Sequence, residues 1–593
     1  MRFWSTLAWV STCLVLAACG GGSNSSSTQP PPGISVAITP ASASVTAGKT
    51  QQFAAVVTGS ADGSVTWEVD QVTGGNAADG TIDSAGLYKA PSTIPSGGEV
   101  TVTAVSQADA SATATAKVTV VTSALLPPIP TTFWGIHVNQ PASFPLQVPY
   151  GEFRAWNGSG AQWPGIETCQ AASGDPKDSC FDWTALDSEL ADLKNGGVQD
   201  IFYTLSRTPA WASSNANDPA CDYFPLGTPF HGACYPPTDL NADGSGPNLI
   251  WKNWVTAIAS RVNDANYRGN HSHVKYWEIW NEFSRSTTIE SWTGTLSWQG
   301  TYNQLVRLAE DARCIITGKG VIHNTPGPGQ QTTCTNAAID SSAVIVAPSH
   351  GVTANGLDAI QNFLYCNHNP IGTCSVGDAG AQAVDVINPH LYANDVTPEV
   401  IATQNIPALR AVLQPAEQTK PLWNGEGSWG KVPSTGSLWQ SDAFARAGFI
   451  PRFFAIYWSA GVTGNYWYSY DTNYGELFDN TLGKLVVPEA TAWTQTYDWL
   501  AGASPAQQPF CQNSGTVVFC DLARTGGYSA RLVWDTQYGQ NCSQMADPII
   551  CGTTSYSVPK QFSKDWIDLS GATHPAGATV TIGANPILLE GQQ

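Results

Sequence analysis

The stretch Tyr276-Trp277-Glu278-Ile279-Trp280-Asn281-Glu282-Phe283 begins with apolar residues and ends in an amide and a carboxylate. A second stretch, Leu422-Trp423-Asn424-Gly425-Glu426-Gly427-Ser428, follows the same pattern. Short apolar runs bounded by polar or glycine residues are typical of strands buried in a parallel sheet. Each stretch therefore predicts a buried strand with an acidic side chain at its carboxyl end.

Eight such runs alternate with amphipathic helical stretches between residues 126 and 502. This alternation predicts an α/β fold with a parallel sheet, and eight strands are the number that closes a (β/α)8 TIM barrel. The active sites of such barrels lie at the carboxyl ends of the strands, where both acidic residues would lie. The expected strands are residues 133–138, 152–156, 200–205, 274–280, 344–347, 384–388, 422–426 and 465–470.

Two connecting helices are indicated by apolar residues that recur on one face. Asp182 is expected to cap the first helix and Gly196 to end it. Only about a dozen proline-rich residues separate the first two strands, so no regular helix is expected there. The expected apolar faces are Leu186, Leu190 and Leu193 in the first helix, and Ile250, Trp254, Ile258 and Val262 in the second.

Strand-like segments flank the barrel on both sides. Residues 34–122 contain short runs rich in Val and Thr, such as 65–69, 100–105 and 117–121, which predict a β-sandwich. Their pattern resembles that of bacterial Ig-like domains, which would make this region a spacer or an adhesive module. Residues 503–593 return to strand-like runs and predict a small C-terminal β-sandwich domain, to which residues 124–130 would add a strand.

The first residues have the layout of an export signal. Arg2 precedes an apolar run over residues 7–18, which predicts a signal peptide over residues 1–18. The sequence Leu16-Ala17-Ala18-Cys19-Gly20 resembles a bacterial lipobox, which implies lipidation of Cys19; the alternative is ordinary cleavage with Cys19 merely nearby. Residues 19–33 predict a flexible tether. We expect an exported protein held at the cell envelope by a lipid anchor on the outer membrane or cell surface, or a secreted one.

The other cysteines indicate an oxidising compartment. Of 14 cysteines, 12 remain beside Cys13 and Cys19, and they fall as close neighbours along the chain. Local disulfides are the natural interpretation, although sequence alone does not fix their connectivity. The candidate pairs are Cys169/Cys180, Cys221/Cys234, Cys314/Cys334, Cys366/Cys374, Cys511/Cys520 and Cys542/Cys551.

Composition excludes some partners. The net charge is −20, and no cluster of Lys and Arg stands out, which argues against binding to nucleic acid or to an anionic lipid surface. The 23 tryptophans suggest a carbohydrate partner, because sugar rings stack on aromatic faces. No spacing of Cys and His indicates a metal site, so neither a metal nor a cofactor is expected. We expect a monomer.

Several motifs occur in the order of the expected strands. Besides Trp280-Asn281-Glu282 and Glu426, they are Phe153-Arg154-Ala155-Trp156, Thr208-Pro209-Ala210-Trp211, Asn388-Pro389-His390-Leu391-Tyr392 and Tyr466-Trp467-Tyr468. Together they resemble the clan A retaining (β/α)8 glycoside hydrolases, most nearly glycoside hydrolase family 39. The resemblance spans roughly residues 130–593.

The resemblance implies a role for each matched residue. Glu282 would be the acid/base and Glu426 the nucleophile, and paired carboxylates are what glycosidic cleavage needs. A retaining enzyme would hold the two carboxyl groups ~5–5.5 Å apart. The remaining substrate-binding candidates are Asn281 on the sugar 2-OH, Arg154 and Tyr392 beside Glu426, Trp467 as a stacking floor, and His390 and His137.

Some of these residues have structural alternatives. Arg154 has as strong a claim to a salt bridge with Glu278 as to a contact with Glu426, and both can hold at once. Glu278 itself is expected to be structural, because it lies deeper on its strand than Glu282. His137 is equally well explained as a structural histidine.

The expected reaction is hydrolysis by double displacement of a poly- or oligosaccharide, β-xyloside-like or a bacterial exopolysaccharide. One alternative is a non-catalytic carbohydrate-binding or adhesion lipoprotein with a decayed barrel. The other is a transglycosylase that uses the same residues.

Overall fold

The computed structural model describes residues 33–46, 48–91, 95, 98–121, 126–140, 143–156, 161–219, 231–283, 298–366, 374–394, 396–430, 442–536 and 554–591. The chain divides into two compact units, Met1–Ala124 and Leu125–Gln593. The predicted signal peptide, Cys19 and the tether up to residue 32 lie outside the described residues. No helix within the described ranges is long and apolar enough to cross a membrane.

The first unit contains only strands among its described residues. The strands form a five-stranded sheet in the order β2-β11-β10-β5-β6 and a four-stranded sheet in the order β3-β9-β8-β7, while β1 pairs with β4. The two larger sheets share one hydrophobic core, which includes Trp67 and Tyr88. Alternate residues of β10 are buried in this core. The arrangement fits a β-sandwich, while the Ig-like resemblance stays a prediction. The strands are β1 Ser35–Thr39, β2 Ser42–Thr46, β3 Thr50–Gln52, β4 Ala54–Thr58, β5 Val65–Val69, β6 Val72–Thr73, β7 Gly75–Asn76, β8 Gly80–Ile82, β9 Leu87–Lys89, β10 Glu99–Ser106 and β11 Thr113–Val121.

The second unit is built on a curled parallel sheet in the order β18-β15-β14-β13-β12-β22-β21-β20-β19. Strands β18 and β19 are two pieces of one barrel strand, and a parallel bridge between Val346 and Val386 joins it to the strand that ends in β20. The sheet therefore closes on itself with eight barrel strands, as in a TIM barrel. The strands are β12 Trp134–Ile136, β13 Glu152–Ala155, β14 Asp200–Thr204, β15 His273–Glu278, β18 Val344–Val346, β19 His350–Gly351, β20 Pro389–His390, β21 Leu422–Gly427 and β22 Val462–Trp467.

Two strands differ from the sequence-based expectation. The eighth strand begins at Val462 and ends at Trp467, three residues earlier than the predicted 465–470. The sixth strand pairs regularly only at β20, with isolated bridges at Val386 and Ile387 before it. Between β12 and β13, the described residues form no α-helix, as the prolines suggested.

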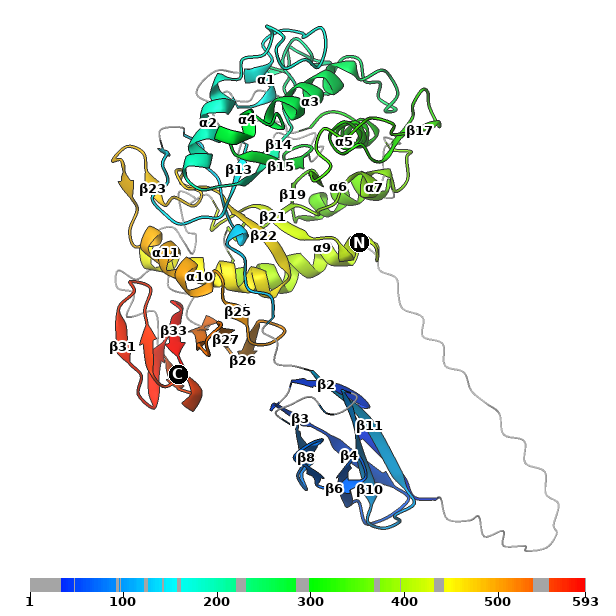
Figure 1. Cartoon of the computed structure of the whole chain (residues 1–593), viewed down its shortest axis with the longest axis vertical. Coiled ribbons are helices and arrows are strands. Elements are labelled where there is room, and N and C mark those ends of the chain that lie inside the picture. Colours follow the sequence, from blue (N-terminus) through cyan, green and yellow to red (C-terminus); the bar gives the residue numbers. More distant parts are fainter. Residues whose placement is uncertain are drawn as a thin grey trace, which may run out of the picture. The chain divides into compact units, whose positions relative to one another are not determined.

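Helices surround the strands (Figure 1). Helix α2 begins at Thr184 and has Gly196 as its C-cap, as predicted, but its N-cap is Trp183 and not Asp182. Asp182 lies one residue earlier, where its carboxylate accepts from the Thr184 backbone N–H at 3.0 Å. The predicted leucine face of α2 is buried. The predicted apolar face of α3 is also buried, apart from Ile250, which is half-buried. The helices are α1 Trp163–Ile166, α2 Thr184–Asn195, α3 Leu249–Val262, α4 Tyr267–Asn270, α5 Tyr302–Thr317, α6 Ala354–Tyr365, α7 Ala379–Ala383, α8 Pro398–Val400, α9 Ile406–Val412, α10 Ala443–Ser459 and α11 Glu489–Leu500.

Large aromatic side chains fill the barrel interior. Phe202, Trp423 and Tyr466 form one buried cluster with Val346 and Val386. Glycine makes room for these rings: a Cβ at Gly135 would lie 2.3 Å from the ring of Tyr466, and one at Gly464 2.8 Å from the ring of Trp423. The interior is thus a packed floor beneath the strand ends.

A further antiparallel sheet follows the barrel within the same unit, in the order β25-β27-β28-β33-β30-β31, with β26 beside β27 and a separate β29-β32 pair. Residues 126–130 form no strand in it, but Ile129 exchanges two backbone hydrogen bonds with Gly502 and Ala503. Trp534 of β28 donates to Glu399, which is also paired with Arg452 of α10. The strands are β25 Ser504–Pro505, β26 Cys511–Ser514, β27 Val517–Ala523, β28 Ser529–Asp535, β29 Thr554–Ser557, β30 Asp565–Ile567, β31 Thr573–Pro575, β32 Thr579–Ile582 and β33 Ile587–Glu590.

Four of the predicted disulfides are formed within the described residues. They are Cys169–Cys180, Cys314–Cys334, Cys366–Cys374 and Cys511–Cys520.

The other two predicted pairs are only partly described. Cys234 is buried and disulfide-bonded, but its predicted partner Cys221 lies outside the described residues. Cys542 and Cys551, the last predicted pair, both lie outside them as well. The pairings of Cys234 with Cys221 and of Cys542 with Cys551 therefore stay predictions.

Candidate active site

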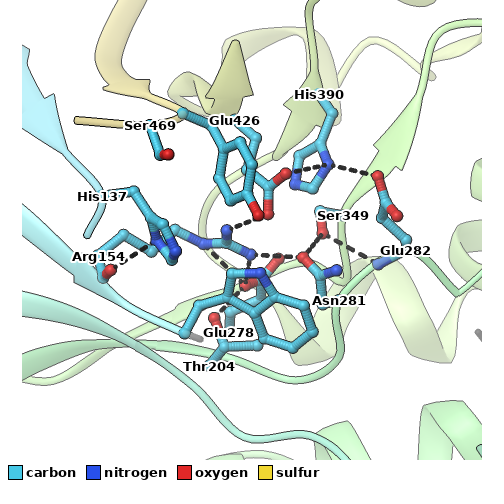
Figure 2. A network of polar contacts seen from close by, with 12 residues as sticks. His137, Arg154, Thr204, Glu278, Asn281, Glu282, Ser349, His390, Glu426 and Ser469 are labelled. Carbon is cyan, nitrogen blue, oxygen red and sulfur yellow. Dashed lines mark hydrogen bonds and ion pairs between the residues drawn. The ribbon is translucent and has the colours of Figure 1, made fainter. Parts of the chain in front are cut away.

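The carboxyl ends of the barrel strands bring the predicted site residues, except Trp467, into one polar network (Figure 2). Arg154 comes from β13, His390 from β20 and Glu426 from β21. Asn281 and Glu282 follow the end of β15. Residues far apart in sequence meet here because all barrel strands run in the same direction.

Arg154 is the centre of this network and has no exposed surface. Its Nη1 donates to Oε1 of Glu426 at 2.6 Å, and its Nη2 donates to Oε2 of Glu278 at 2.5 Å and to Oδ1 of Asn281 at 2.7 Å. Burial opposes the charged form, but Glu278 and Glu426 together raise the pKa of Arg154 above its usual value. One buried cation thus contacts both carboxylates that the sequence offered as its partners.

Glu426 is held at both carboxylate oxygens. Oε1 accepts from Arg154, and Oε2 accepts from the Tyr392 hydroxyl at 2.8 Å. Burial and the negative charge of Glu426 raise the pKa of Tyr392 well above its usual value, so this hydroxyl remains a donor. The Glu426 side chain is 6% exposed, and two donors fix its orientation.

Glu282 reaches further toward solvent, with 20% of its side chain exposed. Its backbone has φ +48°, in the left-handed region that costs a non-glycine residue energy. The backbone N–H donates to the Ser349 hydroxyl at 3.2 Å, which helps to hold this conformation.

His390 lies between the two acids. Its Nδ1 is 3.1 Å from Oε1 of Glu282 and 3.5 Å from Oε2 of Glu426. Burial lowers the pKa of His390 to about 4, so the ring is neutral near pH 7 and has one N–H to share between them. Its Nε2 is buried and has no hydrogen-bond partner within the described part of the chain.

His137 supports the network from the first strand. Its Nδ1 lies 3.0 Å from the Arg154 carbonyl oxygen, and its ring stacks on Tyr468 with centroids 4.8 Å apart. Burial and the nearby Arg154 charge lower the pKa of His137 well below its usual value. The residue is only 1% exposed, which favours the structural interpretation.

The distance between the two acids limits what the site can do. One oxygen of Glu282, one oxygen of Glu426 and a ring nitrogen of His390 all lie within 4.8 Å of one another. Such a trio could hold a divalent metal ion, and the two carboxylates could also flank a single reacting carbon atom.

Trp467 does not lie where the prediction placed it. The side chain has no exposed surface, and its Nε1 donates to the Gly475 carbonyl at 2.7 Å. It packs against Phe453 of α10 and Trp493 of α11, on the outside of the barrel. The reason is strand parity: Tyr466 points into the barrel interior, so Trp467 points outward. A sugar cannot stack on it.

Sequence reasoning missed several residues of the site. Tyr468 and Tyr474 are half-exposed, and their rings lie 6.3 and 6.2 Å from Tyr392 in edge contacts. Strand parity could have pointed to Tyr468, two residues after the inward Tyr466. Ser349, which contacts Asn281 and Glu282, follows β18 without any motif to mark it.

Comparison with known proteins gives only distant likenesses. No protein-family model and no curated protein matches the chain. Among solved structures, a glucosidase from Croceicoccus marinus is 12% identical with a TM-score of 0.48, covering 79% of this chain and 97% of its own. The catalytic domain of GH30 xylanase C from Talaromyces cellulolyticus is 11% identical with a TM-score of 0.44, covering 79% of this chain and 97% of its own. An α-L-arabinofuranosidase from Thermotoga maritima is 10% identical with a TM-score of 0.41, covering 79% and 96%.

These solved structures are glycoside hydrolases by name. At such identities and TM-scores the likeness transfers no activity, so the function of this chain rests on its own residues.

Proposed function

We propose that the chain is an exported retaining glycoside hydrolase that cleaves a poly- or oligosaccharide by double displacement. Glu426 is the nucleophile and Glu282 the acid/base. In this proposal, the predicted signal peptide exports the protein as a monomer, and lipidated Cys19 tethers it to the cell envelope. The substrate class follows the family 39 resemblance, a β-xyloside-like or bacterial exopolysaccharide chain.

The spacing of the two acids is the observation that carries the proposal. An oxygen of Glu282 lies within 4.8 Å of an oxygen of Glu426. Retaining glycosidases hold their carboxyl groups ~5–5.5 Å apart, whereas inverting enzymes need ~6.5–9.5 Å to admit a water. The spacing in this site fits the retaining arrangement.

In the first step, Glu426 attacks the anomeric carbon while Glu282 gives its proton to the departing glycosidic oxygen. The unequal exposure of the two acids suits these roles. Glu426 is held by donors on both of its oxygens, Arg154 and Tyr392, whereas Glu282 lies nearer to solvent, where a leaving group departs. The first step forms a covalent glycosyl-enzyme and releases the first product.

In the second step, Glu282 removes a proton from a water that attacks the same carbon and releases Glu426. The neutral His390 ring can donate its single N–H to whichever acid is charged, because both oxygens lie within 3.5 Å of Nδ1. The Asn281 oxygen is occupied by Arg154 and Ser349, so its amide nitrogen remains to donate to a sugar hydroxyl.

The proposal is tested by hydrolysis of a panel of plant and bacterial polysaccharides and aryl glycosides. Glu426→Gln and Glu282→Gln should each lower the rate at least about 10³-fold, because each removes one of the two chemical roles. Glu310→Gln is a matched control, since Glu310 pairs with His323 outside the site. The configuration of the first product, read by proton NMR, should be retained.

Three outcomes would contradict the proposal in different ways. Inverted product would exclude double displacement. A sugar as the dominant acceptor would make the enzyme a transglycosylase. Binding without cleavage, equal in wild type and Glu426→Gln, would leave a carbohydrate-binding or adhesion protein.

A further inference from the structure

Glu278 is a third carboxylate in the network, and the proposed reaction does not use it. It lies on β15, four residues before Glu282, and it has no exposed surface. Figure 2 shows it beneath Arg154, on the side away from Glu282 and His390. A buried carboxylate is costly unless donors surround it, so its partners indicate why it is there.

Within the described residues, every hydrogen bond of the Glu278 carboxylate comes from a donor on a neighbouring side chain. Oε2 accepts from Arg154 Nη2 at 2.5 Å, from Arg154 Nε at 3.2 Å and from the Thr204 hydroxyl at 2.6 Å. Oε1 accepts from Asn388 Nδ2 at 2.9 Å. This set of donors suits a charged carboxylate. In a protonated carboxyl group, the acid hydrogen would point at the hydrogen of one of these donors.

Glu278 and Glu426 share a single cation. Arg154 directs Nε and Nη2 to Glu278 and Nη1 to Glu426. If Glu278 were uncharged, the whole guanidinium charge would act on Glu426, and a fully compensated carboxylate is a weaker nucleophile. The same guanidinium also holds the oxygen of Asn281.

We propose that Glu278 is a positioning residue that acts through Arg154: it fixes the guanidinium against Glu426 and Asn281, and it offsets part of the cation's charge so that Glu426 stays reactive. This inference rests on the proposed function. It assigns catalytic importance to a residue that never touches the substrate.

The charge of Glu278 can be removed with little change in shape. In Glu278→Gln, the new amide N–H₂ would face Asn388, whose Oδ1 has no partner within the described residues. Rotation of the Asn388 amide would let that oxygen accept the new bond. Glu278→Asp is the complementary variant, since it keeps the charge but withdraws it from Arg154.

The matched control is Glu152→Gln. Glu152 is another buried carboxylate of the barrel, on the same strand as Arg154, and it bonds to the Tyr466 hydroxyl at 2.9 Å. Burial raises the pKa of Glu152 to about 8, so the group is uncharged over the acidic and neutral part of a pH profile. Its replacement by Gln therefore removes no charge below about pH 7.

The experiment measures kcat/KM against pH for these variants in the full chain, with an aryl glycoside that the wild type cleaves. Glu278→Gln should move both limbs of the profile toward acid by about one pH unit, because losing a negative charge favours ionised Glu426 and ionised Glu282. Its maximum should fall about 10- to 100-fold. Glu278→Asp should keep the limbs and lower only the maximum, and Glu152→Gln should match the wild type below pH 7.

The two proposals can fail separately. If Glu426→Gln is inactive while Glu278→Gln keeps both the wild-type limbs and the wild-type maximum, Glu278 is merely structural and this inference is wrong. If the wild type cleaves no substrate of the panel, the proposed function itself fails. Should Glu278→Gln not fold, as judged by circular dichroism, an unchanged maximum in Glu278→Asp would still overturn the inference.

Discussion

Replacing Tyr392 by Phe would test how far the reaction depends on orientation of the nucleophile. The hydroxyl donates to Oε2 of Glu426 at 2.8 Å, and Arg154 donates to Oε1. His390 Nδ1 lies further from Oε2, at 3.5 Å. Hydrogen bonds to charged groups contribute about 1.5–3 kcal/mol. If that energy acts on the transition state, kcat should fall about 10- to 150-fold. The measurement is steady-state hydrolysis of an aryl glycoside with a good leaving group, for which protonation by Glu282 matters least.

Tyr457→Phe is the control for this experiment. Tyr457 is also buried, but its hydroxyl donates to the Leu391 carbonyl at 2.7 Å, behind the site. Its loss should lower thermal stability and leave kcat within about twofold of wild type. The reasoning would be refuted if Tyr392→Phe kept wild-type kcat, or if both variants lost activity equally. In either case the bond from Tyr392 would be structural.

Three further predictions concern metal binding in the site, a buried carboxylate of the barrel and an ion pair of α10. Zn²⁺ should inhibit hydrolysis, because His390 Nδ1 lies 3.1 and 3.5 Å from oxygens of Glu282 and Glu426, close to the ~3.3 Å between ligands of tetrahedral zinc. Dialysis against EDTA should leave the rate of hydrolysis unchanged. A loss of activity on dialysis would contradict the prediction that the reaction needs no metal. Glu152, whose pKa is raised from 4.5 to about 8, contributes stability below pH 4.5 that is lost as pH rises through 8, so Glu152→Gln should flatten the fall in melting temperature over that range. Glu399→Gln should lower the free energy of unfolding of the second unit by about 3 kcal/mol in denaturant titrations, because it leaves buried Arg452 without its ion pair. A change below about 0.5 kcal/mol would mean that stability does not depend on this ion pair.

The strands of the barrel could be predicted because burial on both faces leaves a strong local pattern. Apolar runs such as 200–204 can be identified without any knowledge of their neighbours. The predicted position of the eighth strand is three residues too late, because apolar and aromatic residues continue past Trp467 to Tyr470. Local composition does not mark where hydrogen bonding to β21 and β12 stops.

The site was predictable where chemistry requires a residue type at a strand end, as for Glu282 and Glu426. Residues that serve these acids through space carry no such mark. Ser349 contacts Glu282 from the short segment between β18 and β19, and Thr204 contacts Glu278 from the end of β14. Their roles depend on which strands are neighbours in the closed sheet. The sequence of a single segment does not show which strand it pairs with.

Arg154 shows why two local interpretations need not compete. From the sequence, a salt bridge to Glu278 and a contact with Glu426 are equally good hypotheses, since each satisfies one buried cation. A guanidinium, however, has donors on several edges, and in this site Nη1 serves Glu426 while Nε and Nη2 serve Glu278. Lysine, with one point charge, could not bridge both carboxylates in this geometry. Arg154→Lys should therefore cost activity even though the charge is conserved, because one of the two acids would lose its donor.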